Sequence, residues 1–537
     1  MKSFPALLTV LLLSLNLCAQ TIITGRVNDA NNNSPLAGVT ITQKGGTASA
    51  VSDSTGQYSI TLNSPGTVLS FSYVGYTALD LKTNNKTIIN VSLDAVNNLL
   101  NEVVVTALGI QRDRKQLGYA VQTIRGRDLT EVRQTNMVNA LAGRVAGVQI
   151  TNGSSGVGSA SRIVIRGENS LTGTNQPLFV VDGVPISNNS ITNNTENNET
   201  GFQEVDYGNG AADINPDDIE SLTVLKGAGA AALYGSRAAG GAVIIKTKDG
   251  TGGGRSGVSF NSSVTWENPL VLPQYQNVYG AGAGGKFSYE DGFGAGMNDG
   301  GLTSFGPRLD GQRVKQFNGP STDRNGNPVR GADIIARNGT PITPTPFVAQ
   351  PGNVREYFET GLTAINNIAF SAASNGAGFR LSYTNLSNKG MMPNTDLKRN
   401  SFAVSGNSQI SPRLSARVFL NYIQSHSANR PALGYGSENP MYTFNWTGRQ
   451  VATQDLKNYW QEGRKDFNQF NANYLWLDNP YFSAYENTNG FTKDRVVGNA
   501  SLNYLIASNL NLRLRSGLDN YHDLRESKRA FSTKRFI

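Results

Sequence analysis

The sequence predicts a mainly β protein in three parts, on three observations. Short strands separated by turn residues fill positions 21–95, apolar runs interrupted by glycines fill 111–250, and long strands of alternating polarity begin after 255. The composition agrees, because only 16% of the 537 residues are charged and 59 are glycines, a mixture typical of strands and turns. The predicted fold class is an N-terminal β-sandwich, an α+β domain and the first part of a β-barrel.

Composition and charge argue against several function classes. The formal net charge is +8, small for this length, and no Lys/Arg cluster dominates, so nucleic-acid binding is not indicated. Cys18 is the only cysteine, which excludes disulfides and cysteine-based zinc or catalytic sites from the mature chain. The two histidines, His426 and His522, lie far apart in sequence. We therefore expect a protein that is not an enzyme, with no catalytic residue, metal site or cofactor.

The first 20 residues are predicted to be a cleaved signal peptide. Lys2 supplies the positive region, and residues 7–17 are almost wholly apolar but too short to span a bilayer. Cleavage is expected after Ala19 or Gln20; a lipoprotein signal acylated at Cys18 is the alternative, disfavoured by the bulky residue before it. No later segment approaches about 18 consecutive apolar residues, so the exported protein is soluble outside the cytoplasm or a β-barrel in an outer membrane.

Residues 21–95 are predicted to form a small β-sandwich of seven short strands, because turn signals recur roughly every 8 to 12 residues. The segment resembles the carboxypeptidase-regulatory-like domain, an Ig-like sandwich that is not catalytic in that family. The resemblance rests on Gly25, Val27, PLAGV (35–39), Asp53, GQY (56–58) and FSYVGY (71–76).

A β-branched run, EVVVTA at 102–107, follows the sandwich. It fits one more buried strand. It equally fits an extended segment that pairs with the sheet edge of another protein, where main-chain hydrogen bonds supply the affinity. Periodicity does not separate the two interpretations.

Residues 125–250 are predicted to be a compact α+β domain. Apolar residues at Met137, Leu141 and Val145 have helical spacing and lead into a strand at 148–150. SRIVIRGENSL (161–171) predicts a strand and a turn, and QPLFVVDGVPI (176–186) predicts a strand broken by an Asp-Gly turn. The Asn/Thr-rich stretch 187–200 is expected to be an exposed loop.

The stretch LTVLKGAGAAALYGSRAAGGAVIIKTKD (222–249) superficially matches a dinucleotide-binding fingerprint. Such a site needs a full helix after the glycines to hold the pyrophosphate, but Gly235, Gly240 and Gly241 end this helix after barely two turns. We interpret the stretch as a tightly packed turn, short helix and strand, with Arg237 as a candidate for an ion pair.

The segments after residue 255 alternate strictly between apolar and polar residues, as in VSFNSSVTW (258–266), LSARVFLNY (414–422) and LNLRLRSGL (510–518). A soluble sandwich would alternate too, but arginines and asparagines on the polar face suit a wet lumen, and aromatic residues lie near strand ends. Long irregular stretches at 267–354 and 428–490 alternate with short turns at 411–413 and 507–509. This arrangement is typical of an outer-membrane β-barrel.

Together the parts resemble the SusC/RagA family of TonB-linked outer-membrane proteins. The motifs that carry the resemblance are NEVVVTALGI (101–110), LAGRVAGVQI (141–150), IRGENSL (165–171), PLFVVDGVPI (177–186), NPDDIESLTVLKGAGAAALYGSRAAGGAVIIKTK (215–248) and YFETG (357–361). The family implies a plug inside a roughly 22-stranded transmembrane β-barrel, driven by TonB with ExbB and ExbD. It also implies a SusD-like surface lipoprotein and a bulky nutrient, mostly an oligosaccharide and sometimes a peptide.

The resemblance also assigns domains and site residues. It implies a signal peptide (1–20), a carboxypeptidase-regulatory-like sandwich (21–95), a linker with the TonB box (96–110), a plug domain (111–250) and a partial outer-membrane barrel (251–537). The TonB box would comprise Glu102, Val103, Val104, Val105, Thr106 and Ala107, although LGI (108–110) replaces the small turn that the family more often has next. The plug motifs would comprise Arg166, Gly167, Asp182, Gly183, Lys226, Gly227, Tyr234, Gly235 and Arg237.

The predicted barrel segment has fewer strands than the family implies. The residues after 254 hold only about eight to twelve countable strands, fewer than a closed barrel of this kind needs, and an open sheet would expose two edges in lipid. We therefore expect a C-terminally truncated product or a fragment that does not insert as a working transporter by itself.

Two function hypotheses follow. The first is TonB-dependent import of a nutrient across the cell outer membrane, in contact with its lipid. The second is an exported binding or adhesion protein built from β-sandwich domains, which does not transport. The aromatic residues Tyr275, Tyr279, Trp446 and Trp460 could stack on sugar rings or simply pack the loops, so the substrate-binding residues are not identified.

Overall fold

The computed structural model describes residues 21–30, 33–62, 66–84, 86–94, 121–131, 133–153, 155–156, 158–168, 170–171, 175–189, 204–250, 256–374 and 376–534, and the backbone of 103–105 and 111–113. The predicted signal peptide, and Glu102, Thr106 and Ala107 of the predicted TonB box, lie outside the described residues. The chain divides into two compact units, Met1–Val103 and Val104–Ile537.

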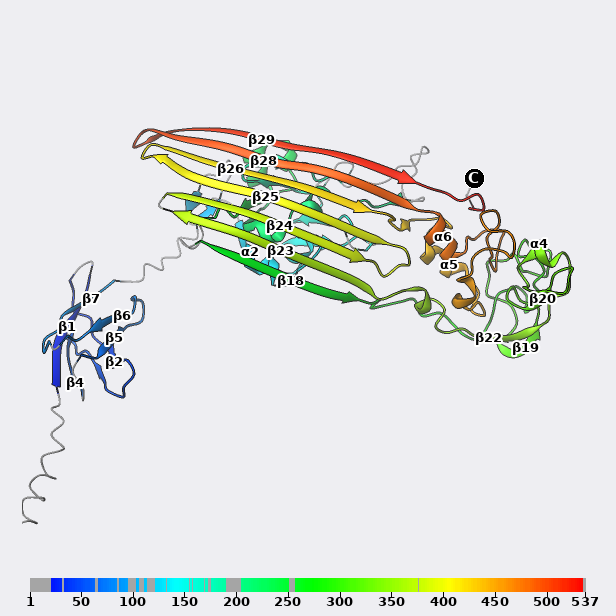
Figure 1. Ribbon diagram of the computed structural model, residues 1–537, viewed down its shortest axis with the longest axis horizontal. Helices are drawn as coiled ribbons and strands as arrows, with labels where there is room; N and C mark the ends of the chain where they lie inside the picture. The colour runs from blue at the N-terminus through cyan, green and yellow to red at the C-terminus, as the bar shows by residue number, and fades with distance from the viewer. Residues whose placement is uncertain are drawn as a thin grey trace, which may run out of the picture. The chain divides into compact units, whose positions relative to one another are not determined.

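The first unit is a β-sandwich, as the turn spacing predicts (Figure 1). One sheet has the order β4-β1-β7 and the other β3-β2-β5-β6. The strands are β1 (Thr21–Asp29), β2 (Thr40–Gln43), β3 (Ser49–Val51), β4 (Gln57–Leu62), β5 (Val68–Ser72), β6 (Leu79–Lys82) and β7 (Val91–Leu93). Alternate side chains, among them Val27, Ile41, Tyr58 and Phe71, form one buried core.

One glycine of the sandwich is fixed by close backbone approach. A Cβ on Gly25 would lie 1.8 Å from the carbonyl oxygen of Ile89, so no larger residue fits beside that chain segment. The Tyr58 hydroxyl donates a hydrogen bond of 2.9 Å to the same carbonyl. This contact satisfies the polar end of an otherwise buried aromatic side chain.

The second unit begins with an α+β domain built on a five-stranded sheet of order β10-β16-β17-β13-β14. Its strands are β10 (Val121–Arg125), β16 (Ile219–Leu225), β17 (Ala242–Thr247), β13 (Leu178–Val181) and β14 (Val184–Ile186). A separate hairpin pairs β11 (Val148–Thr151) with β12 (Arg162–Ile165). Helical turns α2 (Gly126–Thr130), η3 (Asn139–Leu141), η4 (Gly210–Asp213), η5 (Pro216–Asp218), α3 (Ala228–Tyr234) and η6 (Ser236–Ala238) connect them.

The helix expected through Met137, Leu141 and Val145 is wrong. These three side chains are buried, but the segment is a 3-10 turn and a series of bends. Gly143 and Gly147 have φ of 73° and 71°, left-handed values that end a right-handed helix. The three apolar side chains are therefore buried because the chain folds back on itself, and not because one helix presents them on the same face.

The rest of the second unit is a seven-stranded antiparallel sheet of order β18-β23-β24-β25-β26-β28-β29 (Figure 1). Its strands are β18 (Gly257–Glu267), β23 (Gly361–Ser374), β24 (Ala377–Lys389), β25 (Asp396–Ser411), β26 (Leu414–Ser427), β28 (Asn489–Ala507) and β29 (Leu510–Ser527). Tight turns join β23 to β24, β25 to β26 and β28 to β29 at one end, called here the short-turn end. Seven strands among the described residues is fewer than the eight to twelve expected, because the short strands of residues 310–348 pair with one another and not with this sheet.

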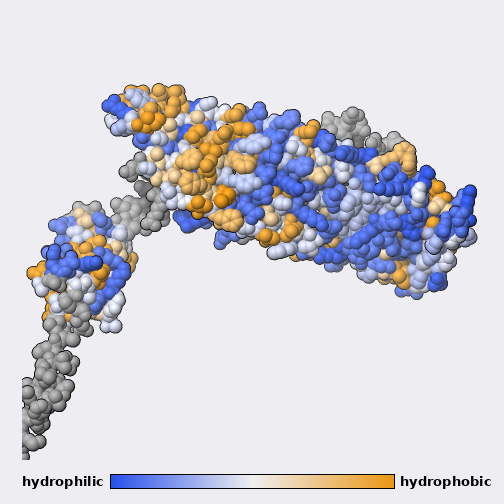
Figure 2. All heavy atoms as spheres, in the orientation of Figure 1, coloured by the Kyte–Doolittle hydropathy of each residue, from blue (hydrophilic) through white to orange (hydrophobic). Residues whose placement is uncertain are grey.

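The outward face of this sheet is apolar, as the alternation predicts. One row of cross-strand neighbours runs through Val258, Phe370, Leu381, Val404 and Leu420. Figure 2 shows apolar residues gathered over the half of the sheet nearer the short-turn end, with polar residues beyond. From Leu414 to Tyr422 the outward positions of β26 span about 26 Å, comparable with the roughly 25 Å apolar band of a membrane barrel.

At the other end of the sheet, residues 268–360 and 428–488 pack into a lobe, called here the loop lobe. Its elements are β19 (Asp310–Val314), β20 (Pro320–Thr322), β21 (Pro328–Arg330), α4 (Ile334–Arg337), β22 (Thr345–Val348), η7 (Arg355–Tyr357), β27 (Ala432–Leu433), α5 (Pro440–Trp446), η8 (Thr453–Leu456) and α6 (Pro480–Glu486). An aromatic core that includes Phe317, Phe444, Phe470 and Tyr481 holds it together. The predicted long loops are therefore ordered where the structure describes them.

Asparagine followed by proline starts the two seven-residue helices of the lobe. The side chain of Asn439 accepts a hydrogen bond from the Met441 backbone N–H, and that of Asn479 accepts one from Tyr481. Asparagine at the N-cap satisfies a backbone donor that has no partner inside the helix, and proline at the first position loses no bond. Among the described residues no helix is long and apolar enough to cross a membrane.

Candidate functional site at the interface of the α+β domain and the seven-stranded sheet

The α+β domain packs against the inward face of the seven-stranded sheet. Its core cluster includes Ala403, Phe419 and Val497 from strands β25, β26 and β28, which lie against buried residues such as Phe179 and Val243. A two-stranded pairing adds to the contact, since β15 (Glu204–Val205) of the domain is antiparallel to β27 in the loop lobe. The domain is therefore in contact with both the strands and the loops of the sheet.

Among the described residues, the most deeply buried ion pairs between the domain and the sheet surround Asp213, at the end of η4. Its carboxylate lies 2.6 Å from Lys493 Nζ and 2.9 Å from a terminal nitrogen of Arg495, and all three side chains are at most 6% exposed. Arg495 also forms a paired contact with both carboxylate oxygens of Asp519 on β29, at 2.9 Å each. Remaining guanidinium hydrogens go to the carbonyl oxygens of Gly210 and Ser187.

The charge of Asp213 is maintained by these cations. Burial by itself raises the pKa of this carboxyl, but Lys493, Arg399 and Arg495 outweigh burial and hold the pKa below its ordinary value. Asp213 is therefore ionised at neutral pH, and the cluster contains two carboxylates and at least two close cations. Removing one partner would leave an uncompensated buried charge, the costly case for buried pairs.

A second contact lies at the start of β16. Arg380 of β24 is 3.0 Å from Asp218, and the Ser382 hydroxyl also donates to that carboxylate. The neighbouring Asp217 pairs with Arg133 inside the α+β domain at 2.7 Å. Burial raises the pKa of Asp217 above its ordinary value, and the nearby Asp218 charge adds to the rise although Arg133 opposes it.

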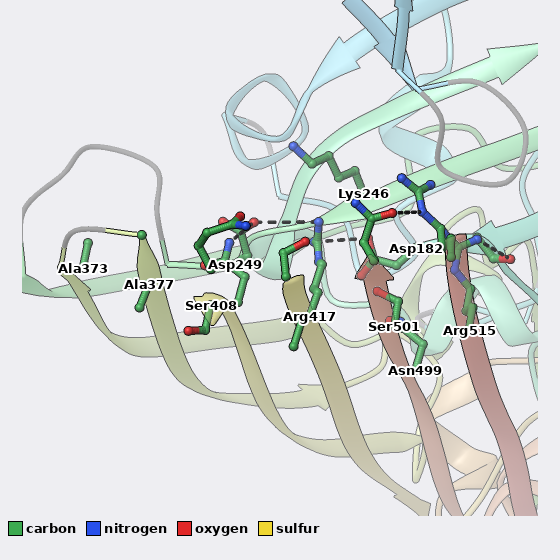
Figure 3. Close-up of a pocket in the computed structure, with 18 of the residues that line it drawn as sticks. Asp182, Lys246, Asp249, Ala373, Ala377, Ser408, Arg417, Asn499, Ser501 and Arg515 are labelled. Atoms are coloured by element: carbon green, nitrogen blue, oxygen red, sulfur yellow. Dashed lines mark hydrogen bonds and ion pairs between the residues drawn. The ribbon is translucent and has the colours of Figure 1, made fainter. Parts of the chain in front are cut away.

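A third contact lies near the short-turn end. Arg417 of β26 is 3.4 Å from Asp182 and 3.7 Å from Asp249, the two acids of the α+β domain that face it in Figure 3. Asp182 also accepts hydrogen bonds from the backbone N–H and the hydroxyl of Thr247. Arg417 is 24% exposed, whereas Arg495 is 2% exposed, so this contact is the more accessible of the two.

The positive and negative partners are distributed in the same way in all three contacts. In each, the α+β domain supplies a carboxylate and the sheet supplies an arginine or lysine from an inward position. Two buried apolar clusters also join the domain to the sheet: the domain core extends to Ala403, Phe419 and Val497, and a second cluster packs Val205 and Tyr207 against Ile365, Leu386, Leu397 and Phe491.

Comparison with known proteins identifies these parts. The family model of the TonB-dependent Receptor Plug Domain matches residues 113–242, and the CarboxypepD_reg-like domain matches residues 23–105. TonB-dependent receptor SusC of Bacteroides thetaiotaomicron is 34% identical over 266 residues, which is 49% of this chain and 25% of that protein. Together these matches support a SusC/RagA-like TonB-dependent receptor.

A second receptor and a solved structure are also similar to this chain. TonB-dependent receptor P26 of Formosa agariphila is 38% identical over 263 residues, covering 48% of this chain and 24% of that receptor. The RagAB peptide importer in its "open-open" state has the same fold, with a TM-score of 0.55 at 22% identity over 80% of this chain and 43% of that chain. The matched region thus spans about a quarter of the curated receptors. In these terms the α+β domain is the plug and the seven-stranded sheet is barrel wall.

The structure places the predicted plug residues at turns. Arg166 and Gly167 follow β12 with φ of 59° and 87°, and Asp182-Gly183 forms the turn between β13 and β14 with φ of 45° and 86°. Left-handed backbone at both positions of a two-residue hairpin turn favours Asp-Gly, as the sequence predicts. Asp182 is at once a turn residue and an acid that contacts the wall.

The glycine-rich stretch closes the plug sheet. Gly227 and Gly235, with φ of 64° and 73°, bound the seven-residue helix α3, which confirms that no full helix follows the glycines. Lys226 donates a hydrogen bond of 2.6 Å to the Ala146 carbonyl, and Tyr234 packs against the core that β13 and β17 share. Arg237 is exposed and forms no ion pair with the residues that the structure describes, so the ion pair expected for it is not observed there.

Of the predicted TonB box, the structure describes only the backbone of Val103–Val105, which forms strand β8. This strand pairs with β9 (Gln111–Asp113) in a two-stranded sheet. The extended conformation is the one that β-strand addition requires. The role of the box stays a prediction.

Sequence reasoning missed the residues that hold the plug most firmly. Asp213, Asp218, Arg380, Lys493 and Arg495 were not singled out, although all five are buried charges. One signal was present: Lys493 and Arg495 occupy the same parity on β28 as apolar Val497, which marks the inward face. Which acid each cation meets depends on the fold of the plug, which no spacing rule shows.

Proposed function

We propose that this chain is the plug-bearing part of a TonB-dependent importer of a bulky nutrient in the bacterial outer membrane. The observation that carries the proposal is a plug domain packed by buried charge pairs and apolar contacts against the inward face of a sheet whose outward face is apolar. The adhesin alternative offers no role for the outward apolar rows.

We propose Glu102–Ala107 as the TonB box, paired with periplasmic TonB, which ExbB and ExbD drive. An extended segment just before the plug is well positioned to transmit a pull to it. The plug-domain match and the extended backbone of Val103–Val105 support this assignment. We also keep the domain boundaries 21–95, 96–110, 111–250 and 251–537 and the signal peptide as proposals.

We further propose a SusD-like surface lipoprotein over the loop lobe, and an oligosaccharide as the first candidate substrate, with a peptide as the second. Exposed aromatic side chains on the lobe, including Tyr435, Phe467 and Trp476, suit contact with a partner or a sugar ring. The four aromatic residues considered from the sequence mostly pack the lobe. Trp460 lies against Phe482 at 5.3 Å, Trp446 against Tyr442 at 6.3 Å, and the Tyr275 hydroxyl bonds Asn445.

Uptake by cells that produce the receptor carrying this chain tests the proposal. Val104→Pro removes a backbone N–H from the proposed TonB pairing, whereas Val104→Ala keeps it. We expect the proline variant to lose nutrient uptake by at least about tenfold, with the alanine variant close to wild type. Uptake by the proline variant at the wild-type rate would disprove the TonB-box assignment. Recovery of the receptor in the soluble periplasmic fraction would favour the adhesin instead.

A further inference from the structure

The chain that follows β29 continues into the loop lobe as a strap, defined here as residues 528–534 (Figure 1). Its backbone is bonded to buried side chains of the lobe. The Lys534 N–H donates to the Asp478 carboxyl group at 2.9 Å, and the Gln469 amide donates to the Ser532 carbonyl at 2.7 Å. The strap therefore fastens the loop lobe to the end of β29.

Asp478 is the centre of this attachment and is completely buried, as are Gln469 and Ser437 beside it. One oxygen of its carboxyl group, Oδ1, accepts hydrogen bonds from the Gln469 amide at 2.6 Å and from the Lys534 N–H at 2.9 Å. Among the described residues, no lysine or arginine side chain forms an ion pair with Asp478. A carboxylate buried without a cation is costly in its charged form.

The other oxygen of the carboxyl group, Oδ2, shares a single hydroxyl with the strap. Ser437 Oγ lies 2.8 Å from Asp478 Oδ2 and 2.8 Å from the carbonyl oxygen of Lys534. Both distances are those of hydrogen bonds between oxygens. A serine hydroxyl has only one hydrogen, however, and neither an ionised carboxylate nor a carbonyl supplies another. With Asp478 ionised, one of the two buried contacts would therefore lack a hydrogen.

A proton on Asp478 Oδ2 satisfies both contacts. The acid O–H then donates to Ser437 Oγ, and the Ser437 hydroxyl donates to the Lys534 carbonyl. Oδ1 keeps the two hydrogen bonds that it already accepts. The count of hydrogens at this site thus favours a neutral Asp478 when the strap is in place.

The electrostatic surroundings favour the same protonation state. Burial raises the pKa of the Asp478 carboxyl to about 6, and the charge of Glu438 adds to the rise. The hydrogen bonds from Gln469, Lys534 and Ser437 oppose this rise of the pKa without cancelling it.

The charged side chains that face this site from the surrounding segments have other partners. Glu438, next to Ser437, is paired with Arg529 of the strap at 2.7 Å. The Lys534 ammonium lies over the ring of Phe293, 5.1 Å from its centroid. Burial lowers the pKa of this ammonium, although the charge of Asp478 opposes the lowering. Lys534 is therefore a weak counter-ion for Asp478.

We propose that Asp478 is a proton-binding site that controls the strap, which is fully fastened to the loop lobe when the proton is bound and loosened when it is lost. Because the folded pKa lies above the unfolded value of about 3.9, the stabilisation is fully present below that value and is lost as the pH rises through the folded pKa. The strap is thus held more firmly in mildly acidic surroundings than at neutral pH. This inference does not depend on the import function.

Hydrogen exchange of the strap amides in the purified receptor, measured by mass spectrometry, tests this proposal. After correction for intrinsic exchange, we expect the protection of residues 528–534 to be roughly tenfold greater at pH 5 than at pH 7.5. Asp478→Asn places an amide N–H where the acid proton would be, and should give high protection at both pH values. Infrared spectra at pH 5 should show a protonated carboxyl band that Asp478→Asn lacks.

Two further variants serve as controls. Ser437→Ala removes the shared hydroxyl and should lower the protection of the strap at pH 5 toward the wild-type value at pH 7.5. Asp310→Asn neutralises an acid of the lobe that is 63% exposed, and should behave as wild type. The comparison of the two pH values in the wild type stands even where a variant fails to fold.

Equal protection of the wild-type strap at pH 5 and pH 7.5 would overturn the proposal, as would a pH dependence that Asp478→Asn retains. The same carboxyl band in the wild type and in Asp478→Asn would show that Asp478 does not hold the proton. None of these results bears on the import function, which Val104→Pro tests separately.

Discussion

Two of the charge contacts between plug and barrel wall, at Asp213 and at Arg417, have the same chemistry but differ in their exposure to water. Toward the loop lobe, Asp213 binds Lys493 and Arg495, which are almost completely buried. Toward the short-turn end, Asp182 and Asp249 share Arg417 beside a cavity. The same pair of residue types therefore gives a firm contact where water is excluded and a weaker one where water enters.

This difference suggests an order of release. Under the proposed import function, a pull on the plug would first separate the accessible Arg417 contacts, because water can replace each partner as it leaves. The Asp213 cluster would separate later, since its three charges must be hydrated together.

Replacing Asp213 with Ala should have the largest effect on stability. It leaves Lys493 buried without a carboxylate and Arg495 with Asp519 alone, so we expect the free energy of unfolding of the plug–wall unit to fall by about 3–5 kcal/mol. Urea unfolding of the detergent-solubilised receptor measures the change. Asp80→Ala, which removes an exposed partner of Lys44 in the sandwich, serves as the control with little effect. Equal effects of the two substitutions would contradict a special role for the buried cluster.

Lowering the pH should weaken the same cluster. Because the pKa of folded Asp213 is held below its unfolded value, its stabilisation is fully present above the unfolded value of about 3.9 and is lost as the pH falls through the folded pKa. Unfolding measured between pH 7 and pH 3 should show a steeper loss at the acid end in wild type than in Asp213→Asn. Parallel profiles would show that Asp213 does not carry this dependence.

Replacing Asp182 with Asn should cost less, about 1–2 kcal/mol, because Arg417 keeps Asp249 and is partly exposed. Asparagine also preserves the left-handed turn conformation at this position. The unfolding assay used for Asp213 provides the comparison. A loss as large as that of Asp213→Ala would reverse the proposed order of the two contacts.

Replacing Asp249 with Asn should have the smallest effect, below about 1 kcal/mol. The side chains of Asp249 and Arg417 are 3.7 Å apart, and Asn407 still bonds to the amide that replaces the carboxylate. A double-mutant cycle with Asp182→Asn measures whether the two acids act on Arg417 together. Strict additivity would mean that Arg417 does not couple them.

Much of the fold was predictable because its signals are local. The alternation of apolar and polar residues in β18, β26 and β29 correctly predicted which side chains face outward. Asp182-Gly183 and the glycines around α3 correctly predicted turns. The helix expected through Met137 was wrong, because spacing alone does not distinguish a helix from a chain that folds back at Gly143 and Gly147. Arg417 was correctly predicted to face inward, but as a residue of a wet lumen rather than as the partner of two plug acids.

The mainly β class, the sandwich, the family motifs and the apolar face of the wall can be predicted from the sequence, because each is a pattern of residues that lie close together along the chain. Which acids and cations meet follows from the packing of the plug against the wall. Asp213 and Lys493 are separated by 280 positions, and Asp182 and Arg417 by 235. Contacts at such separations depend on how the plug fits into the wall, and charge pairing has no period in the sequence from which it could be predicted.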